Sequence, residues 1–169
     1  FDINLLVTPG VIHGLHSNVT NHAISKVEAR ADSFFILDSI GYSDSIQTAI
    51  NTVKTLDSNY VGTYYPWVKI LDRDTNRQVW VPPSVVIAGV ISNTDAVAHE
   101  WFAPAGLNRG GLTSVTEART RLTHAERDDL YDNRINPIAS FPGQGVVVFG
   151  QKTLQAKPSA LDRINVRRL

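Results

Sequence analysis

Cysteine is absent from the sequence, and its absence excludes disulfide bonds, thiolate zinc sites and cysteine nucleophiles together. No apolar run reaches the length of a membrane span, so a membrane partner is not expected. An excess of one charge is lacking too, because 16 Lys and Arg residues balance 16 Asp and Glu residues. A nucleic-acid partner bound through bulk positive charge is therefore not expected either.

Methionine is also missing, although an open reading frame begins with one, and the sequence opens on an apolar run at residues 3–7. We expect a piece of a longer protein, with processing of a precursor as the other explanation. What is present fits a folded domain, because 43% of the 169 residues are hydrophobic and 19% are charged. At this length folding can bury about two-thirds of the surface of the unfolded chain.

The first part of the sequence alternates between short apolar runs and amphipathic patterns. Strands are expected at residues 3–7, 34–38 and 60–65, a turn at residues 8–10, and helices at residues 18–31 and 46–56. The continuous apolar run at residues 34–38 is typical of a strand that is covered on both faces. The alternation predicts an α/β fold with a mostly parallel sheet flanked by helices.

A β-hairpin is expected next, because two segments alternate in polarity around a polar turn. These segments are residues 67–72 and 78–81. Later elements are a helix at 85–98, a docked loop at 101–111, a helix from Thr123 through Tyr131, a strand at 146–149 and a helix at 160–169. The change of pattern near Leu122 suggests two regions, an α/β core at residues 1–122 and a segment at residues 123–169 packed on it.

Three histidines close together in the sequence raise the question of a metal site. His13, His16 and His22 could ligate zinc, with Asp38 completing the set. The first two follow an expected turn rather than lying on a helix, so the sequence does not fix their geometry. Ordinary loop histidines are therefore the favoured interpretation, and no metal or other cofactor is expected.

A serine hydrolase is the enzymatic alternative. Asp38, His22 and one of several serines could form the Ser-His-Asp arrangement that such enzymes use. The sequence has no Gly-x-Ser-x-Gly nucleophile turn, however, and no glycine motif of a nucleotide site. Gly143 and Gly145 are interpreted as turn residues that need a positive φ. No catalytic residue is therefore assigned.

Acidic residues gather on the expected short polar helix. They are Glu126, Asp128, Asp129 and Asp132. Carboxylate oxygens can bind metal ions, but acids near the start of a helix also interact well with its dipole. A solvated helix is the preferred interpretation.

Large aromatic residues lie outside the expected regular elements. Trp101 and Phe102 are in an irregular loop, and aromatics of this kind are common in subunit interfaces. Arg163, Arg167 and Arg168 lie at helical spacing near the end and could bind phosphate or form ion pairs between subunits. These five residues are the candidate subunit-interface residues.

Five short segments occur in an order and spacing that are specific when taken together. They are residues 82–90, 103–110, 136–138, 141–150 and 163–169. In these segments the sequence resembles the contractile tail sheath protein of myovirus-type bacteriophages. The resemblance implies a turn at residues 136–138. The resemblance covers the second half closely, and the first half agrees in its alternating strands and helices.

The resemblance implies a structural subunit rather than an enzyme, with an α/β hydrolase as the alternative. Sheath proteins stack as six-membered rings into a helical tube around an inner tail tube, and contraction drives the tube through the host envelope. The resemblance implies a subtilisin-like sheet without protease activity, and a place in the virion tail after assembly in the host cytoplasm. The implied partners are other copies of the chain, the tail tube protein, and the baseplate and tail terminator proteins.

In members of this family the sequence after Arg-Arg-Leu continues into a helix and a terminal arm. Arms of neighbouring subunits add strands to one another's sheets. The resemblance thus implies that both terminal regions lie outside this sequence, and that the chain by itself is monomeric.

Overall fold

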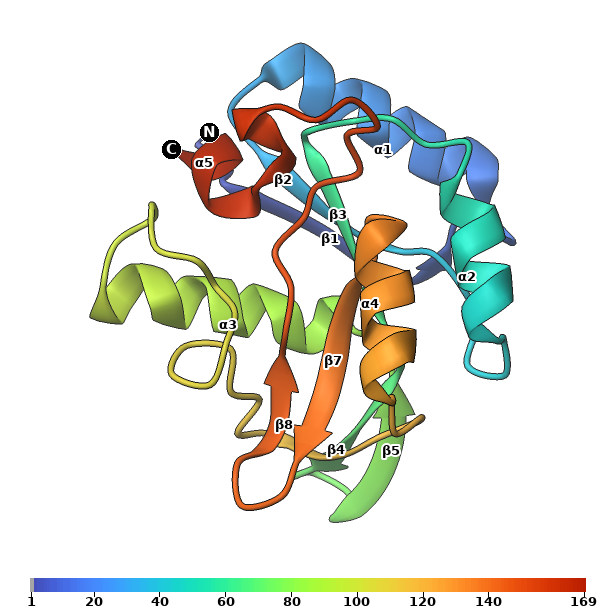
Figure 1. Cartoon of the computed structure of the whole chain (residues 1–169), viewed down its shortest axis with the longest axis vertical. Coiled ribbons are helices and arrows are strands. Elements are labelled where there is room, and N and C mark those ends of the chain that lie inside the picture. Colours follow the sequence, from blue (N-terminus) through green and yellow to red (C-terminus); the bar gives the residue numbers. More distant parts are fainter. Residues whose placement is uncertain (1) are drawn as a thin grey trace.

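A five-stranded sheet forms the centre of the computed structural model, which describes residues 2–169. Its strand order is β1 (Leu5–Ile12), β2 (Phe34–Asp38), β3 (Val61–Tyr65), β7 (Asn136–Phe141) and β8 (Gly145–Val148). The first four strands are parallel neighbours, and β8 pairs antiparallel with β7 (Figure 1). The mostly parallel sheet that the alternating pattern predicts is therefore confirmed.

Helices cover both faces of this sheet, because neighbouring side chains of β2 point to opposite sides. Phe34 and Ile36 pack with α3 (Ser84–Val97) in one core cluster. Phe35 and Leu37 pack in a second cluster, which contains residues of α1 (Ser17–Arg30), α2 (Ile46–Val53) and α4 (His124–Asp132). Every residue of β2 is buried, as predicted for a strand covered on both faces. Within residues 2–169, no helix is both long and apolar enough to cross a membrane.

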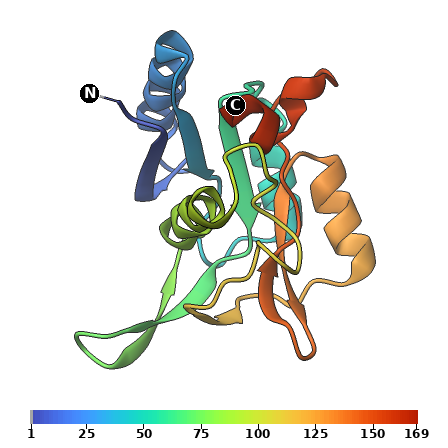
Figure 2. The same ribbon diagram turned by 90° about the vertical axis from the view of Figure 1, so that its left-hand side faces the viewer.

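A second, antiparallel sheet is built on the predicted hairpin. β4 (Val68–Asp72) pairs with β5 (Arg77–Val81), and its other edge pairs with β6 (Val115–Ala118), which the sequence pattern does not indicate. The hairpin, green in Figure 2, extends away from the main sheet. At its base Trp67 donates its indole N–H to the Ile40 carbonyl at 3.0 Å, and the Tyr42 ring lies 5.4 Å from the Trp80 ring. These contacts fix the hairpin to the loop after β2.

The prediction of a turn at residues 8–10 is wrong, because β1 continues through them. The strand pairs with β2 at Val7 and again at Ile12, and the register shifts between these two residues. Gly10 adopts the positive φ of 84° within this irregular stretch. Because β1 is an edge strand, one side of its backbone has no partner strand, and a proline is tolerated there.

The turn expected at residues 136–138 is also wrong, because these residues begin β7. Asn136 is fully buried, and its side-chain amide donates to the carbonyls of Thr63 at 3.1 Å and Lys152 at 2.8 Å. Pro137 follows as the second residue of the strand. An Asn-Pro pair that predicts a turn locally is thus held in a strand by contacts with distant segments.

The last part of the chain crosses the sheet region without forming the long helix expected at residues 160–169. It contains a short 3₁₀ turn, η1 (Ala160–Asp162), and one helical turn, α5 (Ile164–Arg168). Leu154 packs in the core cluster with α4 and Ile164 in the cluster with α3, both fully buried. Residues on both sides of position 122 therefore share one sheet and its cores, and the division into two regions stays a prediction.

Candidate functional site

Four side chains of the loop after α3 form a continuous stack. The Trp101 ring lies 4.3 Å from the Phe102 ring and 5.5 Å from the His99 ring, and both pairs are nearly parallel. The Arg109 guanidinium lies 4.2 Å from the centre of the Phe102 ring. Trp101 is 51% exposed, whereas Phe102 is half-buried. The loop therefore presents an aromatic stack in which Trp101, between His99 and Phe102, is half exposed to solvent.

Backbone hydrogen bonds hold this loop against the edge of β8. Gly106 donates to the Val148 carbonyl at 2.8 Å, and Val148 donates to the Gly110 carbonyl at 2.7 Å. A Cβ atom at Gly110 would lie 2.5 Å from the Val148 carbonyl oxygen, so only glycine fits there. The loop thus covers the outer edge of β8 and fixes the base of the aromatic stack.

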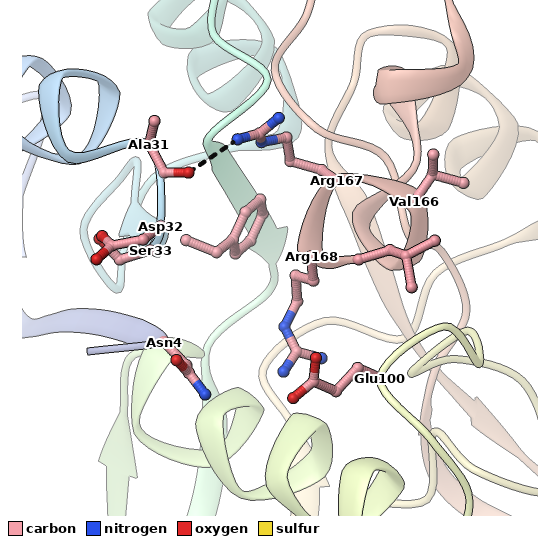
Figure 3. Close-up of a pocket in the computed structure, with 10 residues that line it drawn as sticks. Asn4, Ala31, Asp32, Ser33, Glu100, Val166, Arg167 and Arg168 are labelled. Atoms are coloured by element: carbon pink, nitrogen blue, oxygen red, sulfur yellow. Dashed lines mark hydrogen bonds between the residues drawn. The ribbon is translucent and has the colours of Figure 1, made fainter. Parts of the chain in front are cut away.

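Two of the candidate arginines hold α5 to the rest of the molecule (Figure 3). Arg168, whose side chain is only 4% exposed, pairs through both terminal nitrogens with the Asp95 carboxylate on α3. Arg167 donates to the Ala31 carbonyl, and its guanidinium lies 3.6 Å from the centre of the Tyr60 ring. The two arginines line a cavity of about 420 Å³ between α5 and the beginnings of β1 and β2.

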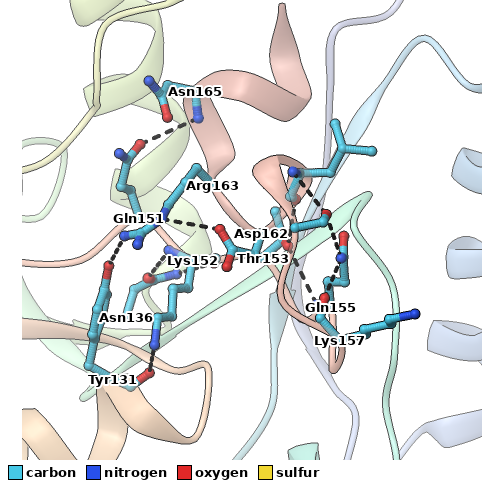
Figure 4. Close-up of polar contacts among 12 residues, drawn as sticks. Tyr131, Asn136, Gln151, Lys152, Thr153, Gln155, Lys157, Asp162, Arg163 and Asn165 are labelled. Atoms are coloured by element: carbon cyan, nitrogen blue, oxygen red, sulfur yellow. Dashed lines mark hydrogen bonds and ion pairs between the residues drawn. The ribbon is translucent and has the colours of Figure 1, made fainter.

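The third arginine belongs to a polar junction below α5 (Figure 4). Arg163 pairs with Asp162 at 3.1 Å and donates to the Tyr131 hydroxyl at 2.7 Å. Lys152 donates to the Tyr131 carbonyl at 2.9 Å, and its backbone N–H donates to the Asn136 side chain at 2.6 Å. The junction joins α4, β7 and the final segment. The side chain of Arg163 is 46% exposed.

Asp38, the carboxylate of the hydrolase alternative, is buried at the carboxyl end of β2. It accepts hydrogen bonds from the backbone N–H of Ser84 at 3.1 Å and from the Ser84 hydroxyl at 2.6 Å. Burial raises the pKa of Asp38 to about 6, although both bonds from Ser84 act to lower it. The carboxylate holds the first turn of α3 on the sheet, at the helix end where the dipole favours negative charge.

The proposed Ser-His-Asp set does not assemble. The Ser84 hydroxyl donates directly to Asp38, so no imidazole stands between them to act as a base. His22, the expected base, is exposed on α1. His13 is buried, and its Nδ1 lies 2.7 Å from the Thr20 hydroxyl. Burial lowers the pKa of His13, which favours the neutral ring.

The zinc alternative does not assemble either. In the part of the chain from residue 2 to residue 169, no group of three His, Asp or Glu side chains could hold a metal ion. The His16 Nδ1 accepts a hydrogen bond from the Ile12 backbone, which ties this ring to the end of β1. The histidines that are close in sequence therefore diverge in space.

The acidic helix and the glycine-rich segments have structural explanations. Thr123 and Glu126 form the capping box predicted from the sequence, and hydrogen bonds from Thr123 lower the pKa of Glu126. Gly143 and Gly145 have φ values of 76° and 77° where the chain turns from β7 into β8, which confirms their interpretation as turn residues. The sequence analysis missed Arg127 of α4, whose guanidinium lies 5.0 Å from the Phe141 ring centre. Only the folded chain brings these two residues together.

Comparison with known proteins decides the family. The model of the phage tail sheath protein central domain matches residues 1–154. The chain belongs to this family. The tail sheath protein of Vibrio phage KVP40 is 43% identical over 118 residues, which are 70% of this chain and 16% of the relative. That of Enterobacteria phage T4 is 39% identical over 128 residues, which are 76% of this chain and 18% of the relative.

Solved sheath structures share the fold of this sheath domain. The sheath of the extracellular contractile injection system PVC in its contracted state superposes with a TM-score of 0.76 at 25% identity, over 99% of this chain and 44% of that one. The contracted helical sheath of the anti-feeding prophage superposes with a TM-score of 0.71 at 28% identity. The match covers 98% of this chain and 42% of that one.

The comparisons confirm the predicted resemblance, because the family model and the two relatives are phage tail sheath proteins. They give no support to the hydrolase alternative. The chain spans only 16% to 18% of the length of the two phage relatives, so it represents one part of the architecture of such proteins.

Proposed function

We propose that the protein carrying this domain is a structural subunit of a contractile phage tail sheath. Its copies stack as six-membered rings around the tail tube, and contraction drives the tube through the host envelope. The observation that carries this proposal is the match of nearly the whole chain to sheaths solved in the contracted state, at 25% and 28% identity. The phage tail sheath family match over residues 1–154 supports it independently.

The proposed partners are other copies of the same protein, the baseplate, the tail tube protein and the tail terminator. A structural neighbour from the baseplate of the anti-feeding prophage, with a TM-score of 0.76 over 98% of this chain, supports the baseplate as a partner. We place the protein in the virion tail, after assembly in the host cytoplasm. Residues 1–169 alone are expected to be monomeric, and residues 123–169 to begin the C-terminal region of the sheath subunit.

The fold suits a subunit that must stay rigid while its contacts rearrange. Both sheet faces are covered, and the loops are attached to the core by specific contacts such as those of Gly110 and Arg168. A contraction of this kind rearranges interfaces without remodelling densely packed cores. We propose that the sheet is a non-catalytic relative of the subtilisin type, with Asp38 and Ser84 serving as a structural contact between β2 and α3.

Trp101 and Phe102 are our leading interface residues. The loop that carries their stack is bonded to the edge of β8, and Trp101 is half exposed. Arg163 and Arg167 keep accessible surface and are second candidates for contacts between subunits. Arg168 is buried in its pair with Asp95, so its proposed role is to set the position of α5 at such an interface.

Electron microscopy of the full-length protein, expressed alone, tests the function. Regular tubes or stacked rings are expected from the full-length protein, and single particles from residues 1–169. A full-length protein that stays monomeric over a range of salt and protein concentrations would contradict the proposal. Labelling with a broad serine-hydrolase probe is the matched check, and stoichiometric labelling would favour the enzymatic alternative instead.

A further inference from the structure

The side of α3 that faces away from the sheet is exposed to solvent and carries no charge. Apart from Asp95, which pairs with Arg168, no residue of this helix is charged. We call the exposed positions the outer face of α3, and they are Val85, Gly89, Ser92, Asn93, Ala96 and Val97. The exposed fractions of Val85 and Val97 are 39% and 69%. The opposite side of the helix packs in one of the two core clusters.

The composition of α3 is that of a helix covered on both sides. A helix that is apolar nearly all round is ordinarily buried, whereas a solvated helix has charged or polar residues on its outer side. α1 follows this rule with exposed Lys26 and Glu28, and α4 follows it with exposed Asp128 and Asp129. Figure 2 shows α3 and α4 on the two sides of the sheet. α3 therefore departs from the rule that the helix across the sheet obeys.

Gly89 lies in the middle of the outer face without a reason in the described part of the chain. Its φ is not among the positive values of the glycines in residues 2–169. An added Cβ would meet no atom within 4 Å beyond the adjoining backbone of its own helix. Glycine inside a helix lowers stability relative to alanine or glutamine. A second segment that approaches the helix backbone at Gly89 explains why no side chain is present there.

The lack of charge on the outer face favours a permanent cover. Contacts between separately folded subunits are on the whole as polar as the remaining surface, whereas permanent interfaces resemble a protein core. A segment of the same protein is a cover of the permanent kind. The chain spans only 16% to 18% of the length of the two phage relatives, so such proteins have ample chain outside the matched region.

The attachment of α5 selects the chain that follows Leu169 as this segment. Arg168 pairs with Asp95, which lies one helical turn from Ser92 on the flank of the outer face. The side chain of Arg168 is only 4% exposed, so residues that follow it start from a fixed point beside α3. Leu169 is itself 80% exposed. A segment tethered at this point has a high effective concentration at the outer face.

We propose that the chain following Leu169 in the full-length protein folds back along the outer face of α3 and packs against Gly89 and Val97. Its side facing α3 is apolar and uncharged. The outer face of α3 is then an interface within one subunit, formed before copies assemble. This inference goes beyond the proposed function and does not depend on it.

Cysteine labelling of the full-length protein measures whether the outer face is covered. Ser92→Cys is compared with Ser25→Cys, which places the same group on the exposed side of α1. Any cysteine outside residues 1–169 is replaced, and unassembled protein from gel filtration reacts with a maleimide in buffer and in denaturing urea. We expect the ratio of the urea rate to the buffer rate to be at least about tenfold higher for Ser92→Cys than for Ser25→Cys.

Photo-cross-linking identifies the segment that covers the face. A benzophenone amino acid replaces Asn93 at the rim of the outer face, and unassembled full-length protein is irradiated. Mass spectrometry then identifies the cross-linked peptides in the monomer band of a denaturing gel. We expect peptides that follow Leu169. Peptides that precede residue 1, or a dimer band, would overturn the proposal, because they identify another segment or a second copy as the cover.

Gly89→Gln gives a test in which the two interpretations predict opposite signs. On a solvated helix the substitution removes a glycine and raises the melting temperature, by about 2–4 °C for a domain of this size. Under a packed segment the added side chain has no room, so we expect a lower melting temperature in the full-length protein. Ser25→Gln on α1 is the matched control and should melt close to the wild type. A rise for Gly89→Gln would contradict the proposal.

The labelling outcomes also separate this contact from the sheath function. If Ser92→Cys reacts slowly only in assembled tubes, a second copy covers α3, which overturns the proposal and supports the sheath function. Equal ratios for Ser92→Cys and Ser25→Cys in both states would show an uncovered helix and would overturn it as well. A full-length protein that protects Ser92→Cys but forms no tubes would support this contact and contradict only the proposed function.

Discussion

Asp38 links the chemistry of a single residue to the position of a whole helix. The folded chain holds this carboxyl with a pKa of about 6, above its ordinary value of 3.8, because burial penalises the charge. The folded state therefore binds the proton more tightly than the unfolded state. Stability from this group is fully present below pH 3.8, declines between pH 3.8 and pH 6, and stays at its lower level above pH 6.

Asp38→Asn should remove this pH dependence. The amide oxygen can accept from the Ser84 backbone and the amide group can donate to the Ser84 hydroxyl, so both contacts survive without a charge. We expect a variant as stable as the wild type or more stable at pH 7, with a gain of up to about 3 kcal/mol that disappears toward pH 4. Urea denaturation from pH 4 to pH 7 measures the difference in unfolding free energy between the two proteins.

The difference between the two proteins is the informative quantity, because His13 opposes Asp38. Burial lowers the pKa of His13 from 6.5, so stability from this group is present above pH 6.5 and falls as the pH drops through its folded pKa. His13 is common to both chains and cancels. A constant difference at all pH values would show that Asp38 ionises normally in the folded state.

Gly110 tests how the aromatic loop is attached to the sheet. Gly110→Ala places a methyl group 2.5 Å from the Val148 carbonyl oxygen and 2.9 Å from backbone atoms of Gly106. Overpacking of this kind costs about 1–3 kcal/mol, and thermal denaturation should show the loss. Gly111→Ala is the matched control, because its added methyl meets no atom within 4 Å. Equal melting temperatures for both variants would mean that the loop is not held as described.

The sequence predicts the chemistry of the candidate residues better than their partners. Adjacent aromatics at Trp101 and Phe102 stand out in the sequence, but only the fold shows that Trp101 is exposed. The contact of Asp38 with Ser84 joins residues 46 positions apart in sequence, and Arg168 meets Asp95 across 73 positions. Local patterns carry no information on such distances, so the arginines could not be divided in advance into buried and exposed ones.

At the scale of elements, the capping box of α4 offers a direct measurement. The Thr123 hydroxyl accepts from the Glu126 N–H at 3.3 Å, and the Glu126 carboxylate accepts from the Thr123 N–H at 2.8 Å. Thr123→Ala should lower the unfolding free energy by about 1 kcal/mol, since an orphan donor at the helix start loses its acceptor. Thr113→Ala, at an exposed loop position, is the control in the same denaturation series. No loss relative to this control would argue against the cap.

Elements defined by periodicity are predicted well, and those defined by pairing are not. β2, the hairpin and the long helices follow from apolar spacing within each segment. β6 was missed because its four residues become a strand only by pairing with β4, and β7 because Asn136 is bonded to Thr63 and Lys152. In both cases a tertiary contact outweighs the local preference for a turn or loop.

At the scale of the whole molecule, the parallel sheet was predictable in type but not in order. Alternating strands and helices imply right-handed crossovers and parallel pairing for β1, β2 and β3. The placement of β7 beside β3 requires the chain to return after the second sheet and its helix, and no local signal marks that return. After β8 the final segment crosses the molecule. There it contributes Ile164 to the core cluster with α3 and Leu154 to the core cluster with α4.

That final segment leads to a prediction for the folding unit. The family match ends at residue 154, but Ile164 is fully buried beyond it and Arg168 pairs with Asp95. A chain of residues 1–154 leaves a hole in the core with α3 and an unpaired carboxylate on that helix. Loss of a buried Ile side chain costs about 2–5 kcal/mol, so we expect the truncated chain to be less stable than residues 1–169 by at least about 3 kcal/mol.

Thermal denaturation of three proteins tests this expectation: residues 1–169, residues 1–154, and residues 1–169 with Ile164→Ala. The substitution removes the core contact but keeps the Arg168–Asp95 pair, so its melting temperature should lie between the other two. If residues 1–154 melt within a few degrees of residues 1–169, the last helical turn is only docked on a core that folds without it. If the three melting temperatures fall in the expected order, the folding unit extends past residue 154 to the arginines of α5. The helical turn α5, which Arg168 holds in place, is then part of the stable core.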